Sequence, residues 1–307
     1  MQAKDHTAVM PKEVIEYLAP GKGAVIVDCT LGRGGHTFCL SKQVGETGRI
    51  IAIDYDQKNI RHFEAEKPAN TETVYGNFKN IDQILRKLKI KKVDGFLLDL
   101  GFSSNQLNSI EGLSFLKDQK LDMRIDPANE LSAKEVVNQF SSKDLERILK
   151  KYGDESNYRK ISGAIREARK EKEIETSKEL REIIQNCFPK SKSKINPATK
   201  SFMALRIFVN KELENLNMFL EKFDDFLKIG GRIALISFHS GEDRIVKNFF
   251  KKKIRKCICS EDEIVCRCDH EPDYRKITKK PIQASEKEVK ANIRSRSAKL
   301  RVYQKIS

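Results

Sequence analysis

The chain lacks any apolar run long enough to cross a membrane. Its longest apolar stretches, around Gly95–Leu98 and Ile233–Ile236, have the length of a strand, whereas a spanning helix needs roughly 20 residues. The first six residues do not place a basic region before an apolar one, so no secretory signal is predicted. We therefore expect a cytoplasmic protein with no membrane partner.

The chain also lacks the cysteine pattern of a secreted disulfide scaffold, because its seven cysteines are an odd number in 307 residues. Four of them form two pairs, Cys257-x-Cys259 and Cys266-x-Cys268. Four thiolates in a short hairpin can make a tetrahedral zinc site, although C-x-C is less typical of such sites than C-x-x-C. Zinc and plain thiols both stay open, and no metal ligand is assigned from the sequence.

Positive charge is in excess. The formal net charge is +15, from 59 Lys and Arg against 44 Asp and Glu, and charged residues make up 34% of the chain. This excess favours a polyanionic partner, because each phosphate that Lys or Arg neutralises releases counterions. The alternative is a lysine-rich proteome in which every protein is basic. We expect a globular protein that binds nucleic acid.

The first hundred residues alternate between strand and helix patterns. Such alternation predicts a parallel, doubly wound sheet whose ligands lie outside the carboxyl ends of the strands. Pro11 suits the first turn of a helix before the first strand. The expected strands are Ala24–Asp28, Arg49–Asp54, Thr73–Tyr75 and Val93–Leu98, and the expected helices are Gly34–Val44, Gln57–Glu66 and Asn80–Leu88.

The middle of the chain shows helix patterns and no convincing strand. Ser132-x-x-Glu135 and Thr176-x-x-Glu179 fit the capping box that begins a helix. The strand and helix pattern resumes with a long helix, Pro197–Leu227, a strand, Arg232–Phe238, and a helix, Glu242–Lys256. We expect an all-helical domain of residues 108–199, inserted into an α/β domain of residues 1–107 and 200–307.

A glycine-rich turn follows the first strand in Val25-Ile-Val-Asp28-Cys-Thr-Leu-Gly32-Arg-Gly34-Gly35-His36. Glycines let the backbone approach a ligand, and the helix N-terminus offers unpaired amides. The dinucleotide fingerprint fails because Thr37 stands at the third glycine position, and no phosphate-binding Gly-Lys-Ser/Thr follows. An adenosine without a pyrophosphate fits better than either. The alternative is a tight turn without a ligand.

Two acids end later strands. Asp54 lies about 20 residues past the glycines, the spacing at which a carboxylate accepts hydrogen bonds from ribose hydroxyls, although a helix cap is the alternative. Asp99 leaves a buried strand at the same edge of the sheet. A carboxylate there can accept a hydrogen bond from a substrate amine, hold it in line for reaction and take up its proton.

Together these stretches resemble the bacterial 16S ribosomal RNA (cytosine-N4)-methyltransferases of the MraW type along nearly the whole chain. Single matches are modest signals, but their order is specific. The matching stretches are Asp28-x-Thr30-x-Gly32-Arg33-Gly34-Gly35-His36, Ala52-Ile53-Asp54, Leu97-Leu98-Asp99-Leu100-Gly101-x-Ser103-Ser104-x-Gln106-Leu107, Leu121-Asp122-Met123-Arg124-x-Asp126, Asn196-Pro197-Ala198-Thr199, Arg206-x-x-Val209-Asn210-x-Glu212-Leu213, Ser237-Phe238-His239-Ser240-x-Glu242-Asp243-Arg244 and Arg296-Ser297-x-Lys299-Leu300-Arg301.

The resemblance implies a Rossmann-like methyltransferase domain that takes its methyl group from S-adenosylmethionine. It further implies transfer to N4 of a cytidine near the decoding centre of 16S ribosomal RNA, within the assembled small subunit. A homodimer is left open. The implied donor site consists of Gly34, Gly35, His36, Asp54, Phe78, Asp99 and Gln106. Phe78 is placed against the adenine ring, with ordinary core packing as the alternative.

Other residues are candidates for substrate contact. His239 is a second catalytic candidate, to orient the cytosine or carry a proton; the alternative is a buried histidine tied to a backbone carbonyl. Asp122 and Arg124 are placed at the substrate mouth, where Arg124 binds a phosphate or pairs with a neighbouring acid. Ser237 and Arg244 complete the candidate set. Basic residues expected to grip RNA are Lys150, Lys151, Arg159, Lys160, Arg166, Arg169, Lys170 and the tail Arg294–Arg301.

Two residues depart from the family pattern. Phe102 replaces a small aliphatic residue and Gly241 replaces a longer side chain, which affects only the detail of the pocket.

Two other functions are disfavoured. A nicotinamide-dependent oxidoreductase is disfavoured by the missing third glycine. A ribosome-assembly factor that binds the donor without turnover is disfavoured by the intact Asp99. Cys29 and Cys39 are expected in the core, so no cysteine nucleophile stands beside the glycine turn.

Overall fold

The computed structural model describes residues 8–101, 110–114, 117–126, 129–188, 196–257, 259, 265, 267–268 and 270–307. The chain divides into two compact units. The α/β unit comprises Met1–Phe102 and Leu213–Ser307, and the helical unit comprises Ser103–Glu212. The expected insertion, residues 108–199, is shorter than the helical unit, mainly because helix α10 (Thr199–Val209) packs against α7 (Ser142–Gly153) inside it.

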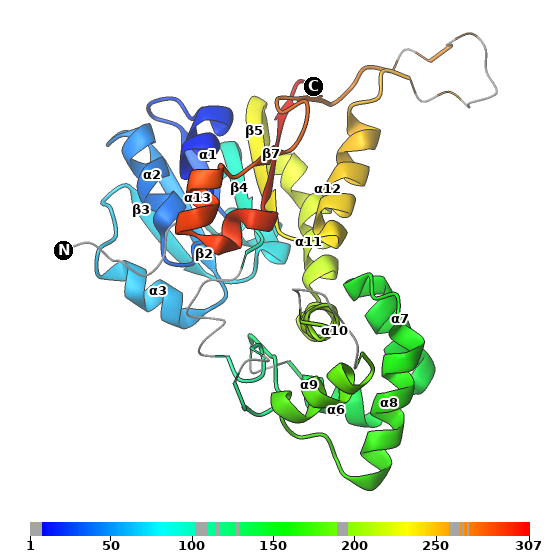
Figure 1. The fold of residues 1–307 in the computed structure, drawn as a ribbon. Helices are drawn as coiled ribbons and strands as arrows, with labels where there is room; N and C mark the ends of the chain where they lie inside the picture. The colour runs from blue at the N-terminus through cyan, green and yellow to red at the C-terminus, as the bar shows by residue number, and fades with distance from the viewer. Residues whose placement is uncertain are drawn as a thin grey trace. The chain divides into compact units, whose positions relative to one another are not determined.

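An eight-stranded sheet forms the centre of the α/β unit (Figure 1). Its order is β3-β2-β1-β4-β5-β8-β6, with β7 paired to β8. The first five strands are parallel, and β8 runs antiparallel to both β5 and β6. The strands are β1 (Val25–Asp28), β2 (Arg49–Asp54), β3 (Thr71–Tyr75), β4 (Val93–Asp99), β5 (Leu227–Ser237), β6 (Tyr274–Lys276), β7 (Ile282–Gln283) and β8 (Lys299–Lys305). The predicted doubly wound, Rossmann-like sheet is confirmed, and its order reverses between β1 and β4.

Alternating side chains of the strands feed two cores, one on each face of the sheet. On one face Phe96 and Leu98 of β4 pack among residues of α4, α11 and α12. On the other face Leu97 packs among residues of α1 and α2. This alternation is the period-two pattern of a strand buried on both sides. The helices are α1 (Pro11–Leu18), α2 (Gly35–Val44), α3 (Gln57–Glu64), η1 (Phe78–Asn80), α4 (Ile81–Lys87), α11 (Glu212–Lys222), η2 (Phe223–Phe226), α12 (Ser240–Lys253), α13 (Glu286–Ala291) and η3 (Ile293–Ser297).

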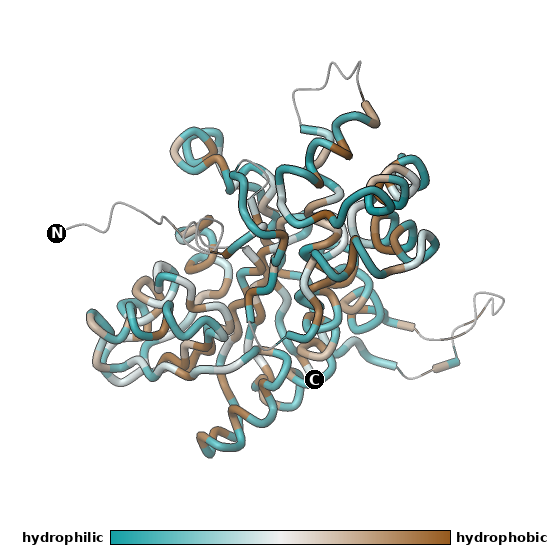
Figure 2. The backbone as a smooth tube through the Cα atoms, turned by 90° about the horizontal axis from the view of Figure 1, so that it is seen from below, coloured by the Kyte–Doolittle hydropathy of each residue, from teal (hydrophilic) through white to brown (hydrophobic). Residues whose placement is uncertain are grey.

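Most helices of the helical unit are amphipathic, with one buried face. Along the backbone tube, hydrophilic and hydrophobic stretches alternate (Figure 2). Helix α10 differs, because within it only Lys200 is exposed. Phe208 of α10 packs edge-on against Phe140, with ring centroids 5.6 Å apart, and lies 5.9 Å from Tyr152. These aromatic contacts tie α10 to the helices around it. The other helices are α6 (Ala133–Gln139), α8 (Tyr158–Glu171) and α9 (Ser177–Asn186).

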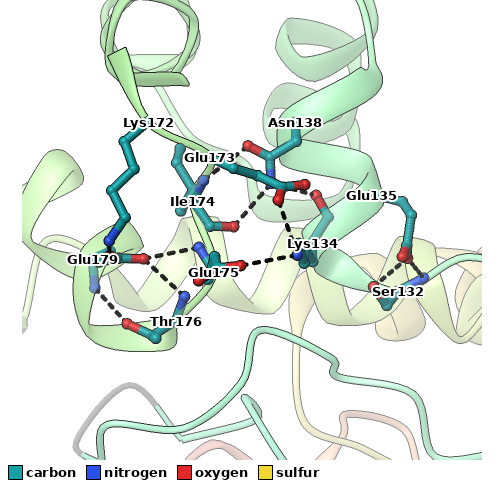
Figure 3. A network of polar contacts seen from close by, with 10 residues as sticks. All are labelled: Ser132, Lys134, Glu135, Asn138, Lys172, Glu173, Ile174, Glu175, Thr176 and Glu179. Carbon is teal, nitrogen blue, oxygen red and sulfur yellow. Dashed lines mark hydrogen bonds and ion pairs between the residues drawn. The ribbon is translucent and has the colours of Figure 1, made fainter. Parts of the chain in front are cut away.

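Both predicted capping boxes are present in a polar network of the helical unit (Figure 3). The Thr176 hydroxyl accepts from the amide of Glu179, and Glu179 accepts from the amide of Thr176 in return. Asn138 holds the chain before α9 at two points, since it donates to the carbonyl of Ile174 and accepts from its amide, at 2.8 and 3.0 Å. Lys134 adds ion pairs to Glu173 and Glu175. Side chains therefore fix the entry to α9.

The predicted long helix Pro197–Leu227 is wrong in its continuity. The chain forms α10, a break at Asn210 and Lys211, and then α11. Lys211 has φ 51°, which ends a right-handed helix, and the Arg206 guanidinium pairs with Glu212 across the break at 2.9 Å. The sequence between 197 and 227 keeps an apolar helical period throughout, so the period does not reveal this turn.

Candidate functional site

The glycine turn between β1 and α2 is shaped by backbone conformations that favour glycine. Gly32 and Gly34 have φ of 53° and 82°, and a β-carbon on Gly34 would lie 2.3 Å from the ring of Phe63. Gly34 also occupies the N-cap of α2, where it has no side chain to cap the first amides. The turn therefore presents bare backbone at the carboxyl end of β1, which suits close approach by an adenosine.

Asp54 ends β2 directly beside this turn. Its carboxylate is buried and accepts from the amides of Gly32 and Asp56, each at 2.7 Å, and from the side chain of Asn59 at 3.1 Å. Burial raises the pKa of Asp54 to about 6, although these donors oppose the shift. A carboxylate has roughly four acceptor positions, so one is left for a ribose hydroxyl. The residues fit the implied donor at this point.

Asp99 and His36 meet at the reversal point of the sheet. His36 Nδ1 lies 3.7 Å from Asp99 Oδ2, and His36 Nε2 lies 2.9 Å from the carbonyl oxygen of Val9. Since that carbonyl only accepts, Nε2 carries a proton and donates it. Burial raises the pKa of Asp99, and the nearby His36 opposes this shift. A carboxylate with raised proton affinity thus stands beside the glycine turn.

Asp28 and Thr30 support this pair, and the sequence analysis assigned no role to either. The amide of Asp99 donates to the Thr30 hydroxyl at 2.8 Å. The buried Asp28 carboxylate accepts from the Thr37 hydroxyl at 2.6 Å and from the amide of Thr30 at 3.2 Å. Burial raises the pKa of Asp28 as well. The sequence signal that could have identified these residues was the acid Asp28 at the end of β1, followed two and nine residues later by Thr30 and Thr37.

Phe78 lies in the hydrophobic core of the α/β unit. It begins η1, its exposed fraction is 8%, and its ring packs edge-on against Phe219 with centroids 5.9 Å apart. Phe78 therefore has ordinary core packing, which was the alternative to a contact with the adenine ring. Its contact with the adenine ring stays a prediction. Gln106 and Phe102 lie outside the described residues.

His239 is the N-cap of α12. Its Nδ1 accepts from the amides of Gly241 and Glu242, at 3.2 and 3.4 Å, and its Nε2 lies 3.0 Å from Glu242 Oε1. Glu242 in return accepts from the amide of His239, which completes a capping box built on histidine. Nδ1 thus caps α12, whereas Nε2 lies beside Glu242 without a hydrogen bond to any described residue. The catalytic role of His239 stays a prediction.

The remaining candidates at this end of β5 differ in exposure. Ser237 is buried, and its hydroxyl lies 3.5 Å from the carbonyl oxygen of Lys299 on β8. Arg244 is exposed on α12. Its neighbour Asp243 pairs with both guanidinium arms of Arg301, at 2.7 and 3.1 Å. Part of the basic tail therefore binds within the α/β unit.

In the helical unit Arg124 pairs with Asp122, one of the alternatives considered. Two guanidinium nitrogens meet the two carboxylate oxygens at 2.7 and 2.9 Å, and a third donates to the carbonyl of Asn129. Asn210 braces this turn, because it donates to the carbonyl of Met123, whose φ is 64°. The role of Asp122 and Arg124 in substrate binding stays a prediction.

Several of the basic residues expected to grip RNA have partners inside the helical unit. Lys160 donates to the carbonyl of Cys187 at 2.6 Å, and Arg169 donates to that of Val137 at 2.7 Å. Arg166 and Lys170 both pair with Glu167. Arg159, with an exposed fraction of 80%, lies 4.0 Å from a carboxylate oxygen of Glu146, a long ion pair that leaves it accessible to a phosphate. Part of the positive charge of this unit is already paired with groups of the same unit. The number of its Lys and Arg residues therefore exceeds the number available to bind RNA.

Two cysteines near the glycine turn differ in exposure. Cys29 is buried as expected, but Cys39 is exposed, so its assignment to the core was wrong. Cys39 lies on the exposed side of α2, a face that the helical period of the sequence did not decide.

Within the described part of the chain, none of the helices is long and apolar enough to cross a membrane.

Comparison with known proteins identifies the family. The profile of the MraW methylase family matches residues 3–306. The chain is 44% identical over 305 residues to the ribosomal RNA small subunit methyltransferase H of Caldicellulosiruptor saccharolyticus, covering 98% of this chain and 99% of the relative. It is 45% identical over 305 residues to the protein of the same name from Clostridium botulinum strain Kyoto, with the same coverage.

These matches run through the whole of both units, so they include the glycine turn, Asp54 and Asp99. They confirm the resemblance on which the expected cofactor rested, and the bare turn beside a strand-end carboxylate fits that cofactor. The chain therefore belongs to the MraW methylase family and takes its methyl group from S-adenosylmethionine.

Proposed function

We propose that this methyltransferase methylates the exocyclic N4 amine of a cytidine in 16S ribosomal RNA, near the decoding centre and within the assembled small subunit. The names of the curated relatives support ribosomal RNA of the small subunit as the substrate. The net charge of +15 supports a polyanion. The observation that carries the choice of an amine is the half-buried Asp99 beside His36, at the carboxyl end of β4.

The chemistry requires a proton acceptor. S-adenosylmethionine supplies a methyl group on a sulfonium sulfur. The cytosine nitrogen forms the new N–C bond as the S–C bond breaks, and a proton then leaves the nitrogen. Asp99 accepts a hydrogen bond from the amine and so holds it in line for the attack. Its raised pKa suits it to take up the proton, because a base works best when its pKa approaches the working pH.

The other candidate residues position Asp99, hold the methyl donor or contact the RNA. His36 is a positioning residue, since its Nε2 is fixed by Val9 while its Nδ1 faces Asp99. The donor is held by Gly34, Gly35, His36, Asp54, Phe78, Asp99 and Gln106. The helical unit recognises the RNA, with Asp122 and Arg124 on it, and Ser237 and Arg244 contribute from the α/β unit.

Methyl transfer from labelled S-adenosylmethionine tests the proposal. Assembled small subunits and naked 16S RNA are each incubated with the full chain, and the RNA is digested to nucleosides. We expect the label in N4-methylcytidine, with loss in Asp99→Ala. Asp225→Ala is the matched control, because this exposed carboxylate lies in η2, before the amino end of β5.

Donor binding is measured separately by calorimetry. Label in another nucleoside would overturn the choice of N4, and label in naked RNA alone would overturn the assembled subunit. Donor binding without transfer to either substrate would contradict the catalytic function. It would leave an assembly factor that binds the donor without turnover.

A further inference from the structure

Three cysteine sulfurs converge in the segment between α12 and β6. The Sγ atoms of Cys257, Cys259 and Cys268 all lie within 4.8 Å of one another. The Sγ atoms of Cys257 and Cys268 are 3.6 Å apart, although the residues are eleven positions apart in the chain. This distance is far longer than the roughly 2.05 Å of a disulfide. It is close to the edge of about 3.8 Å in a tetrahedron of sulfurs around zinc, with Zn–S of about 2.3 Å.

We propose that Cys257, Cys259 and Cys268 bind a structural zinc ion. The spacing of Cys257-x-Cys259 recurs in the sequence as Cys266-x-Cys268. Cys266 lies outside the described residues, and its serine variant tests whether it supplies a fourth ligand. Three thiolates on one ion are typical of structural zinc sites, whereas catalytic sites use mainly His and carboxylate ligands and keep one position open.

A backbone hydrogen bond supports this assignment. The amide of Cys259 points at the sulfur of Cys257, with N···S 3.4 Å. Amide donors around a metal-bound thiolate orient the sulfur and stabilise its charge. Arg255, Lys256 and Arg267 are exposed cationic neighbours in the sequence and offset the negative charge of the thiolates.

The described residues around the three cysteines bury little apolar surface. Between residues 255 and 272, none of the described residues is buried, and Val265 has an exposed fraction of 68%. Metal binding supplies the free energy of folding to many small motifs that bury little apolar surface. At its base Lys253 at the end of α12 pairs with Asp273 just before β6, at 2.8 Å. Zinc would close the segment a second time, between Cys257 and Cys268.

The sulfur spacing favours a single ion over an iron–sulfur cluster. In a cluster the cysteines are divided among several irons, and sulfurs on different irons lie farther apart than sulfurs on one ion. The Sγ atoms of Cys257, Cys259 and Cys268 all lie within 4.8 Å of one another, which suits three ligands of one ion. Zinc also fits because thiolates in a tetrahedral set form a common structural zinc site. This proposal is independent of the RNA substrate.

The test is the metal content of the full-length protein, purified under reducing conditions without chelator. We expect about one zinc per chain by elemental analysis, and loss of most of it in Cys257→Ser, Cys268→Ser and Cys266→Ser. Cys39→Ser is the matched control, because this exposed thiol lies on α2 outside the cluster, and it should retain the zinc. Cobalt exchanged into the wild-type site should give the strong visible absorption of tetrahedral thiolate coordination.

Three results would overturn the proposal. The first is wild-type protein with its thiols reduced and essentially no bound metal. The second is zinc that survives in both Cys257→Ser and Cys268→Ser. The third is iron with inorganic sulfide in place of zinc. Because the serine variants leave the glycine turn and Asp99 unchanged, the metal content is measured independently of methyl transfer.

Discussion

His36 joins the N-terminal segment to the end of β4. Its Nε2 meets the carbonyl of Val9 at 2.9 Å, and its Nδ1 lies 3.7 Å from the carboxylate of Asp99. The bond to Val9 fixes the tautomer, so Nδ1 has no proton when the ring is neutral. The ring nitrogen facing Asp99 is then an acceptor, and its 3.7 Å separation from the carboxylate is longer than a hydrogen bond.

Asp99→Asn should lower the rate of methyl transfer by roughly 10² to 10⁴-fold, the range for loss of a general base. The amide keeps the shape of the side chain but cannot take up the proton. We expect a smaller change in the affinity for S-adenosylmethionine, measured by calorimetry. Asp225→Asn serves as the control in single-turnover kinetics. A rate within a few-fold of wild type would remove Asp99 from the proton-accepting role.

Gly34→Ala should destabilise the fold by roughly 1–3 kcal/mol and weaken donor binding by about tenfold or more, because alanine at φ 82° is strained and its methyl group would meet Phe63. Gly163→Ala is the matched control. It lies within α8 with nothing within 4 Å of the new methyl group, so it should stabilise by about 0.5–1 kcal/mol. Urea unfolding and donor titration of both variants check this. Wild-type donor affinity in Gly34→Ala would exclude the turn from the donor site.

His239→Ala should destabilise the protein by about 1 kcal/mol, because it removes the cap of α12. His239→Asn should restore most of this stability, since asparagine is a good N-cap residue. If capping is the main role, the transfer rate of His239→Asn stays within a few-fold of wild type. Stable but inactive His239→Asn would instead establish a chemical role for the imidazole. Thermal unfolding and transfer rates of the two variants separate these outcomes.

Asp54 should make the stability depend on pH. Its pKa of about 6 in the fold lies above the value of about 3.9 expected in the unfolded chain, so the folded state binds the proton more tightly. Its contribution to stability is therefore fully present below about pH 4 and is lost as the pH rises through about 6. The loss is roughly 3 kcal/mol for two pK units. We expect the difference in unfolding free energy between wild type and Asp54→Asn, measured by urea unfolding, to shrink by this amount across this pH window. The same pH dependence in both proteins would contradict the prediction.

Strands β1, β2 and β4 could be predicted because they are short apolar runs that end in acids. Arg49–Asp54 was predicted to the residue, and the ends of β1 and β4 were placed within one residue. Fully buried strands give this pattern regardless of their neighbours. The pattern also placed Asp54 and Asp99 at the same edge of the sheet, before any contact was known.

The partners of side chains could not be predicted in this way. Three donors occupy Asp54 and leave one acceptor position, Asp122 neutralises Arg124, and Nδ1 of His239 caps its own helix. Each pairing depends on backbone directions that the sequence pattern does not encode, such as the left-handed Met123 beside Arg124. The break at Lys211 was missed for the same reason, since a single residue with positive φ leaves the apolar period unchanged.

The order of the strands constrains when the protein can become active during synthesis. β4 ends at Asp99 and pairs with β5, which begins only at Leu227, and the ladder of β5 continues in β8 near the end of the chain. The ribosome must therefore complete the whole helical unit before Asp99 gains the neighbouring strand that fixes it. Pairing across such a long separation is slow, because the loop must be closed before the contacts form. A nascent chain that stops within the helical unit would carry the glycine turn and both acids, yet would have no complete site.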